Sequence, residues 1–537
     1  MANTFKKTID MLAWRQVAPS PNAHAAAACL ASDLRSGLSR NPFVYQLVSN
    51  TVLNRYNVVT KAWNLVQSPA LTGTFAVGAA MAFAPSLGLV GTIAAGATTT
   101  KVIINTAFPT AVGVNMLANR GGSGEYGFKL RIIGYGSGKT EERYIVANTG
   151  GTQPTINVLS AFTFTPASGD RYEIVAGRLF MLGAGALAAN IWRTLEVASN
   201  TLSTGLATTN LPATVATDSN IIALDEQYTP YDNKPGEGMI KGAFTYDTGV
   251  EVRMALAATA TGASSLTGQA TLGDAVVAAH EYRNFQIRIV QDTVNPTANG
   301  QRRIISGHTA GASPVYTLGT AWTVQPSANA KYVIELPNLL LMRSSATTSV
   351  YTYNYSDQTI NNGTNSITTN AWHATYFGVA GAANAVGGLW APSFGIQPDE
   401  NRNARHSHCH FFRGGGAVVD TLDIAAAIAG TWSSAVVIDG AVTLTTGTGG
   451  ALAPTDNEGR FFYMNIYTAS AINQMYRFDV KHRVLSPFTP TDFIQSGTAV
   501  GGNRMASYCA VDGTTNYDCL FLQSHLSTIS QEMIPLV

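Results

Sequence analysis

Residues 408–432 of the chain read HCHFFRGGGAVVDTLDIAAAIAGTW. An apolar run ends in three glycines, a second run that mixes apolar and polar residues follows, and a tryptophan begins a third run. Short apolar runs of this kind are typical of β-strands, and glycines between them are typical of turns. The stretch therefore predicts three consecutive antiparallel strands joined by short turns.

Five other stretches repeat this order of an apolar strand, a turn of small residues, and a strand that mixes aromatic residues with Asp or Asn. These stretches begin at Phe43, Arg178, Leu339, Arg460 and Tyr517. A supersecondary unit that recurs along a chain indicates a repeat architecture, and the spacing from His408 to Phe461 is close to a period of about 50 residues. The chain is therefore expected to contain about six equivalent sheets.

The repeated order resembles the blade of a kelch β-propeller. In that family the second strand ends in a glycine pair, the third carries Tyr and often Asp, and a Trp begins the fourth. The matching residues are Gly414, Gly415, Tyr476, Asp479, Trp63 and Trp432. The resemblance implies an all-β fold: a degenerate, kelch-like propeller of about six blades.

The last repeat lacks a fourth strand before the sequence reaches Pro535. A ring with an incomplete blade leaves an open sheet edge, which invites aggregation. The segment Ala13–Pro19 has the form of an isolated fourth strand and carries Trp14 at the kelch position. We expect this segment to pair into the sixth blade and close the ring.

Two longer stretches, Tyr126–Ile174 and Tyr282–Glu335, repeat a different pattern. In each, an alternating strand, a glycine turn and a charged strand lead through Thr-rich sequence to an aromatic residue before a proline. Phe164 with Pro166 and Trp322 with Pro326 are the expected counterparts, and each copy closes with Tyr-x-Ile. The two stretches predict two related small β-domains.

Each small domain is expected as an insertion between the first and second strands of a blade. For the first, these strands are expected at Ala80–Ala84 and Arg178–Leu182; for the second, at Met239–Tyr246 and Leu339–Met342. Insertions at matching positions would place both domains on one face, on neighbouring blades. The expected divisions are a closing strand and first blade at 1–89, an inserted domain at 90–176, a blade at 177–249, an inserted domain at 250–337, and the remaining blades at 338–537.

The composition constrains the class of protein. The 537 residues carry a net charge of +1; only 12% are charged and 46% are hydrophobic. Such a chain is not disordered, and its neutral balance argues against nucleic-acid binding through bulk charge. Few charges among many small polar residues suit a rigid β-protein or a large assembly whose surfaces are covered by neighbours.

Four cysteines, Cys29, Cys409, Cys509 and Cys519, form no CxxC motif. Four cysteines in so long a chain are not a disulfide framework, and free buried thiols are expected, although the spacing of Cys509 and Cys519 would allow a hairpin disulfide. The N-terminal sequence has no apolar signal region, and the apolar stretch Phe75–Ile93 is read as packed strands and loops. Synthesis in a cytoplasm followed by assembly is expected.

The stretch Gly134–Thr140 matches the pattern GxxxxGK[ST]. A phosphate-binding loop requires a helix after the motif, because the helix N-terminus holds the phosphate. The residues that follow form a strand pattern, so Gly134–Thr140 is expected to be a hairpin turn.

The alternating residues His406, His408 and His410 would share one face of a strand, and three imidazoles suit zinc or nickel. A polar strand entering the fourth blade is the preferred interpretation of these histidines, and His373 and His482 are isolated. Asp420 and Asp423 have the positions of ordinary strand and turn acids. The sequence predicts no catalytic residue, no cofactor-binding residue, no metal ligand and no cofactor, and the chain is not expected to be an enzyme.

Tyr351, Tyr353 and Tyr355 alternate along one strand. Such a stripe can stack sugars or bases, but packing within or between blades is the preferred interpretation. The acidic, Pro-containing loop Asp225–Gly238 has the character of a contact with a partner subunit.

The pattern that includes Gly300, Gln301, Arg303, Ile305, Trp322, Pro326, Tyr332 and Ile334 is similar to a β-module of tailed-bacteriophage virion proteins. Together with the degenerate propeller and the low charge, it resembles the tail nozzle, or hub, proteins of short-tailed phages. The resemblance implies a structural virion protein of the tail that assembles as a homo-oligomer, a hexameric ring.

Such a ring would extend the DNA channel below portal and adaptor, contact the genome non-specifically, help retain it and anchor tail fibres, with no membrane contact. Two alternatives remain open: a head-decoration, neck or fibre-attachment virion protein, and a glycan-binding or glycan-active propeller.

Overall fold

The strands form sheets that are arranged as a ring. The computed structural model describes the following residues: 12–23, 29–32, 43–49, 52–58, 60–65, 79–84, 87–118, 128–188, 191–216, 219–224, 256–268, 278–335, 337–344, 347–356, 358–380, 382–391, 408–416, 418–424, 431–436, 449–452, 461–467, 473–479, 484–488, 505–512, 515–523 and 530–535. Within these residues the structure is almost entirely β, and its helical content is one 3₁₀ turn, Pro296–Ala298.

Six four-stranded antiparallel sheets form the blades among the described residues. Blade 1 contains β2 (Cys29–Ser32), β3 (Phe43–Ser49), β4 (Val52–Asn57) and β5 (Ala62–Leu65). Blade 2 contains β6 (Ala80–Ala84), β13 (Arg178–Leu182), β15 (Trp192–Glu196) and β16 (Thr201–Leu202). Blade 3 contains β18 (Asn220–Leu224), β26 (Leu339–Arg343), β27 (Val350–Asn354) and β30 (Ala371–His373).

The remaining three blades are built from the C-terminal part of the chain and one N-terminal strand. Blade 4 contains β31 (Ala385–Ala391), β32 (His408–Gly414), β33 (Val418–Asp423) and β34 (Thr431–Val436). Blade 5 contains β35 (Gly449–Leu452), β36 (Phe461–Tyr467), β37 (Asn473–Asp479) and β38 (Val484–Phe488). Blade 6 contains β39 (Met505–Asp512), β40 (Thr515–Gln523), β41 (Ser530–Pro535) and β1 (Leu12–Gln16).

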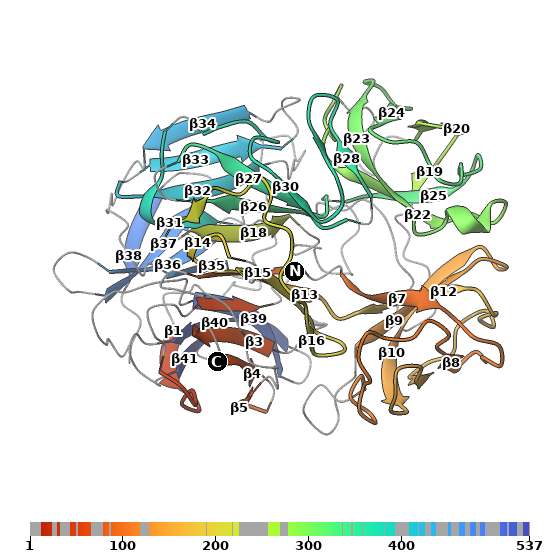
Figure 1. The fold of residues 1–537 in the computed structure, drawn as a ribbon, viewed down its shortest axis with the longest axis horizontal. Coiled ribbons are helices and arrows are strands. Elements are labelled where there is room, and N and C mark those ends of the chain that lie inside the picture. Colours follow the sequence, from red (N-terminus) through yellow and green to blue (C-terminus); the bar gives the residue numbers. More distant parts are fainter. Residues whose placement is uncertain are drawn as a thin grey trace, which may run out of the picture.

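The first strands of the blades line the centre of a closed ring. Contacts run from β2 to β6, β18, β31, β35 and β39, and from β39 back to β2. The fold is therefore a six-bladed β-propeller, as the strand pattern predicted. Figure 1 shows the blades together, with the colours following the sequence around the ring.

The closing strand lies where the sequence placed it. Strand β1 pairs antiparallel with β41, with Trp14 opposite Met533 and Gln16 opposite Gln531. This pairing gives blade 6 the fourth strand that its C-terminal segments lack. The last C-terminal strand is Ser530–Pro535 and begins directly after the stretch Leu526–Ile529 that the sequence pattern indicated; Leu526–Ile529 lies outside the described residues.

Tryptophans on fourth strands tie neighbouring blades together. The indole N–H of Trp63 on β5 donates to the carbonyl oxygen of Ala18 at 2.9 Å. The indole N–H of Trp432 on β34 donates to the carbonyl oxygen of Phe377 at 3.0 Å, in the segment that follows blade 3. These two tryptophans fasten blades 1 and 4 to the segments that follow the preceding blades 6 and 3.

One predicted strand is wrong. The first strand of blade 3 is β18, whose Ile221 pairs with Met342 on β26, and not Met239–Tyr246, which lies outside the described residues. Residues Ile221–Leu224 are all buried. A strand that is buried on both faces shows no alternation of apolar and polar residues, which is why the periodicity did not mark it.

The first of the two small β-domains, called module 1 from here on, lies between β6 and β13 in the chain. It contains β7 (Gly88–Thr92), β8 (Lys101–Ile103), β9 (Lys129–Gly134), β10 (Lys139–Asn148), β11 (Thr155–Val158) and β12 (Arg171–Val175). Its strand order is β7-β12-β9-β10-β11-β8. The sheet curls on itself, because Ile93, next to β7, forms a bridge with Ile104, next to β8.

The second small β-domain, called module 2 from here on, has the same strand arrangement and lies between β18 and β26 in the chain. It contains β19 (Leu256–Ala257), β20 (Ala260–Gly262), β21 (Ser265–Thr267), β22 (Gln286–Gln291), β23 (Arg302–His308), β24 (Val315–Leu318) and β25 (Lys331–Glu335). Its order, β19-β25-β22-β23-β24-β21-β20, is that of module 1 with one strand added. The long strand is bent in both modules at a shift of register, between Ile145 and Ala147 and between Ile305 and Gly307.

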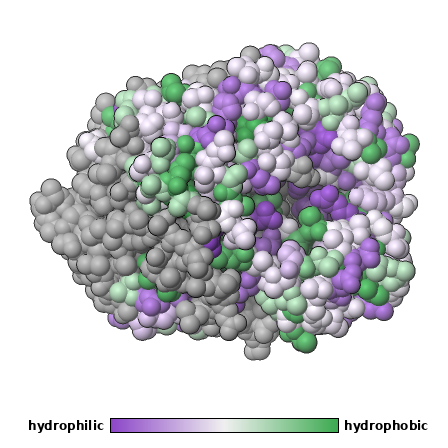
Figure 2. All heavy atoms as spheres, in the orientation of Figure 1, coloured by the Kyte–Doolittle hydropathy of each residue, from purple (hydrophilic) through white to green (hydrophobic). Residues whose placement is uncertain are grey.

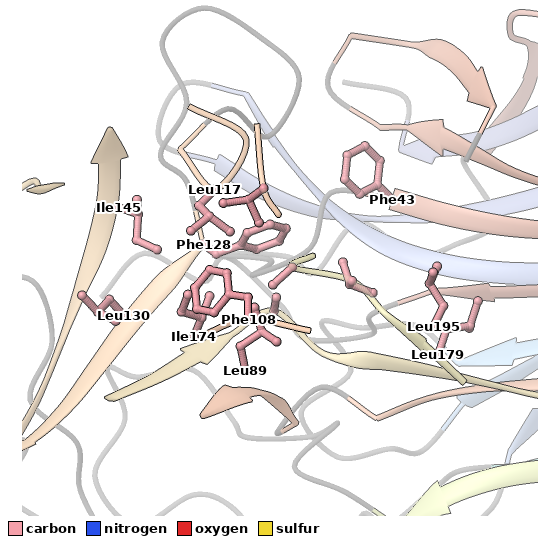
Figure 3. Packing of buried hydrophobic residues seen from close by; sticks show 14 of the residues in the cluster. Phe43, Leu89, Phe108, Leu117, Phe128, Leu130, Ile145, Ile174, Leu179 and Leu195 are labelled. Atoms are coloured by element: carbon pink, nitrogen blue, oxygen red, sulfur yellow. The ribbon is translucent and has the colours of Figure 1, made fainter. Parts of the chain in front are cut away.

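The modules lie beside each other on one side of the propeller (Figure 1), and strands β10 and β22 are in contact. Their cores are continuous with the blades. Figure 3 shows Leu130, Phe128 and Ile174 of module 1 in the same apolar cluster as Phe43 of blade 1 and Leu179 of blade 2. Burial of these shared apolar surfaces stabilises each module in a fixed position.

Two small ladders complete the described strands. Strand β14 (Gly185–Ala186) pairs with β17 (Thr214–Val215), and β28 (Ile360–Asn361) pairs with β29 (Ser366–Ile367). The second ladder lies between β27 and β30 of blade 3, and β28 contacts β23 of module 2. This ladder of blade 3 therefore packs against β23, the long strand of module 2.

Candidate functional site: the interface between the modules

Each module presents a glycine to the other. A Cβ on Gly138 of module 1 would lie 2.5 Å from Cα of Thr293 and 2.9 Å from the carbonyl oxygen of Asp292 in module 2. A Cβ on Gly300 of module 2 would lie 2.7 Å from Cδ1 of Ile133 in module 1. The backbone of module 2 leaves no room for a side chain at Gly138, and a side chain at Gly300 would require the end of the Ile133 side chain to move.

A buried ionic cluster lies on the face that module 1 turns away from its own core. Arg131 on β9 stands opposite Glu142 on β10 and beside Glu173 on β12. Its Nε donates to Glu142 at 2.7 Å and its Nη1 donates to Glu173 at 2.8 Å. The exposures are 2%, 1% and 5%, so these charges are removed from water. Buried charges are tolerated when they are paired and hydrogen-bonded, as here.

Module 2 adds two positive charges to this cluster. Arg288 on β22 stands directly opposite Arg302 on β23, and both are buried. Like charges that face each other across two strands destabilise a sheet. Burial raises the pKa of the Glu173 carboxyl, and the positive charges of four arginines outweigh this and hold that pKa well below its usual range: Arg171, Arg131, Arg302 and Arg288. Arg288 and Arg302 thus act on a carboxylate of the other module.

Hydrophilic residues gather where the two modules meet on the face shown in Figure 2. In chemical terms the cluster is a set of fixed ions. Glu173 remains ionised and accepts hydrogen bonds, so it is not poised to donate a proton. The arrangement serves to hold two domains in one relative orientation.

The charged strand of each module forms the same clip. In module 1, Nε of Arg143 donates to the carbonyl oxygen of Ala161 at 3.0 Å, and the guanidinium lies over the ring of Phe162. In module 2, Nε of Arg303 donates to the carbonyl oxygen of Ala321 at 2.7 Å, and the guanidinium lies over Trp322.

The aromatic counterpart of Trp322 is therefore Phe162 and not Phe164, which the sequence pattern had aligned. Phe164 instead lies against Gly134, where an added Cβ would be 2.4 Å from its ring. Phe162 lies four residues before Pro166, as Trp322 lies four residues before Pro326, so this spacing was the sequence signal that distinguished it from Phe164.

The residues Gly134–Thr140 form a hairpin turn, as predicted. Lys139 pairs with Gly134 across the hairpin, and β10 follows where a phosphate loop would have a helix. The Lys139 ammonium donates to Thr163 Oγ1 at 3.0 Å. Gly138 has a φ of +65°, which glycine adopts without strain. The glycines and the lysine have structural roles in module packing.

The three alternating histidines are only partly described. His406 and the side chain of His408 lie outside the described residues. His410 is buried on β32, and its Nδ1 hydrogen-bonds with Oγ1 of Thr421 on β33 at 2.8 Å. Among the residues that the structure describes, no group of three or more His, Cys, Asp or Glu residues could hold a metal ion.

The tyrosine stripe is buried, as the preferred interpretation predicted. Tyr351, Tyr353 and Tyr355 are exposed by 8%, 0% and 4%. The ring of Tyr353 lies 5.1 Å from Trp192, and that of Tyr355 lies 5.1 Å from Phe180, both in blade 2. The stripe fills the space between blades 2 and 3 and is not a platform for sugars or bases.

Asp420 has a role that its sequence position did not reveal. It receives hydrogen bonds from Arg343 of blade 3 and from Arg413 of its own blade. Burial opposes ionisation, but these donors and Ser434 lower the pKa of the Asp420 carboxyl. The Arg343 guanidinium also lies over the ring of Phe411, 4.6 Å from its centroid. Asp420 therefore joins blades 3 and 4.

The other singled-out residues have structural positions or lie outside the described part. His373 accepts a hydrogen bond from the Thr375 N–H at 3.1 Å; His482 and the loop Asp225–Gly238 lie outside the described residues. Cys29 and Cys409 are free, and burial raises the pKa of both thiols.

The register of blade 6 places Cys509 opposite Asp518 and Cys519 opposite Tyr508. The strand register does not place Cys509 and Cys519 opposite each other, so the hairpin disulfide that their spacing allowed is not favoured.

Comparisons with known proteins give remote likenesses. No protein-family model matches the chain, and no curated protein matches it. Among solved structures, the chain is similar to the C-terminal WD40 domain of Sif2, with 8% identity, 98% of this chain and 99% of that chain covered, and a TM-score of 0.29.

Two further likenesses are as distant. Sqt1 of Saccharomyces cerevisiae is 9% identical, with 98% of this chain and 99% of that chain covered and a TM-score of 0.28. The NanB sialidase of Streptococcus pneumoniae is 10% identical, with 96% of this chain and 83% of that chain covered and a TM-score of 0.23. In the described part of the chain no helix has the length and apolarity needed to cross a membrane. At these TM-scores the likenesses assign neither a function nor a family to the chain.

Proposed function

We propose that the chain is a structural protein of a bacteriophage virion, the nozzle or hub ring of a short tail. In this role it extends the DNA channel below portal and adaptor, helps to retain the genome, and offers attachment sites to tail fibres. It acts as a homo-oligomer, a hexameric ring, without a cofactor and without catalysis, after assembly in the host cytoplasm.

The observation that carries the proposal is the pair of modules locked together on one side of a closed propeller. The sequence pattern that resembles virion modules corresponds to a structural unit: Arg303, Gln301 and Trp322 form one clip. Module 1 builds the same clip with Arg143 and Glu141. Two copies of a virion-type module in a fixed relative orientation suit repeated contacts within a symmetric assembly.

The low surface charge supports the same proposal. Only 12% of the residues are charged, and several of these charges are buried in pairs such as Arg131 with Glu142. Obligate assemblies bury more than about 2,000 Å² per interface and remove much of their surface from water. A chain that spends its charges internally suits such an assembly.

The test uses exposed valines as probes of the assembling face. Val114 of module 1 and Val294 of module 2 are 74% and 71% exposed, and Val379 after blade 3 is 53% exposed. An aspartate at an exposed position changes folding stability by about 0.5 kcal/mol or less. The variants Val114→Asp and Val294→Asp are mixed with portal and adaptor and weighed by mass photometry, and Val379→Asp serves as the matched control.

We expect the wild-type chain and Val379→Asp to form rings on the portal–adaptor complex, visible by cryo-electron microscopy, and the module variants to form fewer. A chain that stays monomeric with portal and adaptor and binds or cleaves a polysaccharide contradicts the proposal and favours the glycan alternative. Antibody labelling of the head instead of the tail in virions favours the decoration alternative.

A further inference from the structure

Two histidines hold the turn that leads into β22 of module 2. The backbone N–H of Tyr282 donates to Nε2 of His308 at 2.9 Å. Nδ1 of His308 lies 2.9 Å from the carbonyl oxygen of Thr309, so Nδ1 carries the proton. The backbone N–H of His308 donates in turn to Nδ1 of His280 at 3.1 Å. Each ring therefore accepts a hydrogen bond from the backbone through an unprotonated nitrogen.

Module 1 builds the same arrangement from two asparagines. The N–H of Leu117 donates to Oδ1 of Asn148 at 2.8 Å, and Nδ2 of Asn148 donates to the carbonyl oxygen of Thr149 at 2.7 Å. The N–H of Asn148 donates to Oδ1 of Asn115 at 3.2 Å. Asn148 ends β10 as His308 ends β23. Asn115 thus takes the place of His280, and Asn148 takes the place of His308.

The backbone of the two turns agrees as well. Asn115 and His280 both have positive φ angles, +57° and +61°. The N–H of Asn115 donates to the carbonyl oxygen of Asn148 at 2.9 Å, and the N–H of His280 donates to that of His308 at 3.1 Å. The two modules therefore share one turn geometry and differ in whether the acceptors can be protonated.

This difference has a chemical consequence. An amide oxygen remains an acceptor at any physiological pH, whereas a protonated imidazole has a donor on both nitrogens. A proton on Nε2 of His308 would face the N–H of Tyr282, and a proton on Nδ1 of His280 would face the N–H of His308. In module 2, protonation therefore replaces each of these hydrogen bonds by a repulsive contact between two donors. In module 1 the equivalent acceptors are amide oxygens, so no such contact forms.

The turn held by the histidines also reaches the propeller. Nδ2 of Asn284 donates to the carbonyl oxygen of Ile424, which follows β33 in blade 4, at 2.5 Å. Nδ1 of His280 lies close to Gly307, where an added Cβ would be 2.9 Å from it. Loss of the histidine contacts is thus passed to the junction of module 2 with blade 4.

We propose that His280 and His308 make module 2 acid-sensitive: protonation of these rings releases residues 278–285 and their contact with blade 4, while module 1 stays closed. This inference does not depend on the proposed function. It concerns a conformational device within the fold, and any partner seated at the junction of module 2 and blade 4 would experience it.

The surrounding groups keep both rings neutral. Burial and then Arg283 lower the pKa of His280. Burial lowers the pKa of His308, the bond to Thr309 raises it, and the charges of His280 and Arg283 lower it. The nearest carboxylate of the turn, Glu281, accepts a hydrogen bond from the Ala278 N–H at 3.0 Å.

The neighbouring strands present tyrosines to the histidines. The rings of Tyr282 and Tyr316 lie 5.8 and 5.2 Å from that of His308, and Tyr332 on β25 lies behind Tyr316. Burial raises the pKa of Tyr316 well above its ordinary value, so this phenol stays neutral. Since a lowered folded-state pKa disfavours protonation, the hydrogen bonds are complete above the ordinary histidine pKa of about 6.5 and are lost as pH falls below it.

Hydrogen–deuterium exchange with mass spectrometry tests the inference on the full-length chain at pH 7.5 and 5.5, with exchange corrected for its intrinsic pH dependence. We expect protection of residues 278–285 to fall by about tenfold at pH 5.5, because a pH one unit below the ordinary histidine pKa of about 6.5 favours the protonated, open form by about that factor. Protection of residues 113–118 in module 1 should not change, which makes them an internal control. The double variant H280N/H308N, which copies the module 1 arrangement, should keep its protection at both pH values.

Unchanged protection of 278–285 in the wild-type chain overturns the inference, and so does an equal loss in the double variant. If the double variant does not fold, exchange at the C2 position of the histidine rings in the wild-type chain gives each pKa directly. Values below 6.5 for both histidines support the inference, and a value of 6.5 or above for both overturns it.

Discussion

Arg343 of blade 3 and Asp420 of blade 4 form an ion pair in which both side chains have an exposure of 0%. The pair bridges two blades that lie next to each other in the ring, and Arg413 completes it at 2.6 Å from the carboxylate. Removing one member of a buried pair leaves an uncompensated charge in the interior, which costs more than the pair itself contributes.

The variant Asp420→Asn should therefore lose about 3–5 kcal/mol of unfolding free energy. Denaturation followed by tryptophan fluorescence measures this loss. Arg178→Gln breaks the pair of the partly exposed Arg178 with the buried Glu196, and it should lose less because water reaches the Arg178 side chain. Equal losses in the two variants would show that the inter-blade pair has no special role.

Glu173 should make the contact between the two modules sensitive to acid. The pH range of this effect lies below that of the histidines, which act at the junction of module 2 with blade 4. Its pKa is depressed in the folded chain, so its contribution to stability is complete above the ordinary glutamate pKa of about 4.3 and is lost as pH falls below that value. Glu173→Gln should be less stable than wild type by about 3–5 kcal/mol at pH 7. The difference between the two should narrow from pH 5 to pH 3 in denaturant titrations; a constant difference would contradict the assignment.

Gly138 should report on the closeness of the modules. Gly138→Ala introduces both an unfavourable positive φ and a Cβ that collides with Thr293. Gly169→Ala is the matched control, because Gly169 has a φ of +91° with nothing within 4 Å of an added Cβ. We expect a loss of about 1–2 kcal/mol for the control and a further loss of about 1–3 kcal/mol for Gly138→Ala. Thermal unfolding of the two variants side by side measures the difference.

Removal of the closing strand β1 should make the propeller associate with other copies through the uncovered edge of blade 6. Deletion of residues 1–16 uncovers the edge of β41, whose pairing with β1 is otherwise complete. Exposed strand edges pair with other chains, so size-exclusion chromatography with light scattering should show dimers and larger species. Deletion of residues 1–10 keeps Leu12–Gln16 and should elute as the intact chain does; identical profiles for both deletions would refute the closure role.

Much of this fold could be predicted from local sequence patterns. The hairpin at Gly414 and the strand around Tyr476 are marked by turn glycines and alternating residues, which depend on near neighbours in the chain. The closing strand at Trp14 followed from the need to complete a ring. Strand Asn220–Leu224 was missed because burial of both faces removes the alternation.

The interface of the modules could not be read from the sequence in the same way. Arg131 and Arg288 are each the third residue of their strands, β9 and β22, so charged residues at equivalent outward positions were a visible signal. An outward charge in one module is ordinarily solvated, however. The close approaches of Gly138 to Thr293 and of Gly300 to Ile133 show that these faces are buried against each other.

The closing strand also places a condition on how the protein can be made. Leu12–Gln16 leaves the ribosome long before its partner Ser530–Pro535. At a translation rate of roughly 5–20 residues per second, about half a minute to two minutes separate them. During that interval strand β1 has no strand with which to pair. A nascent chain that stalls before Ser530 therefore cannot complete blade 6. The propeller closes only after the C-terminal segment is released from the ribosome.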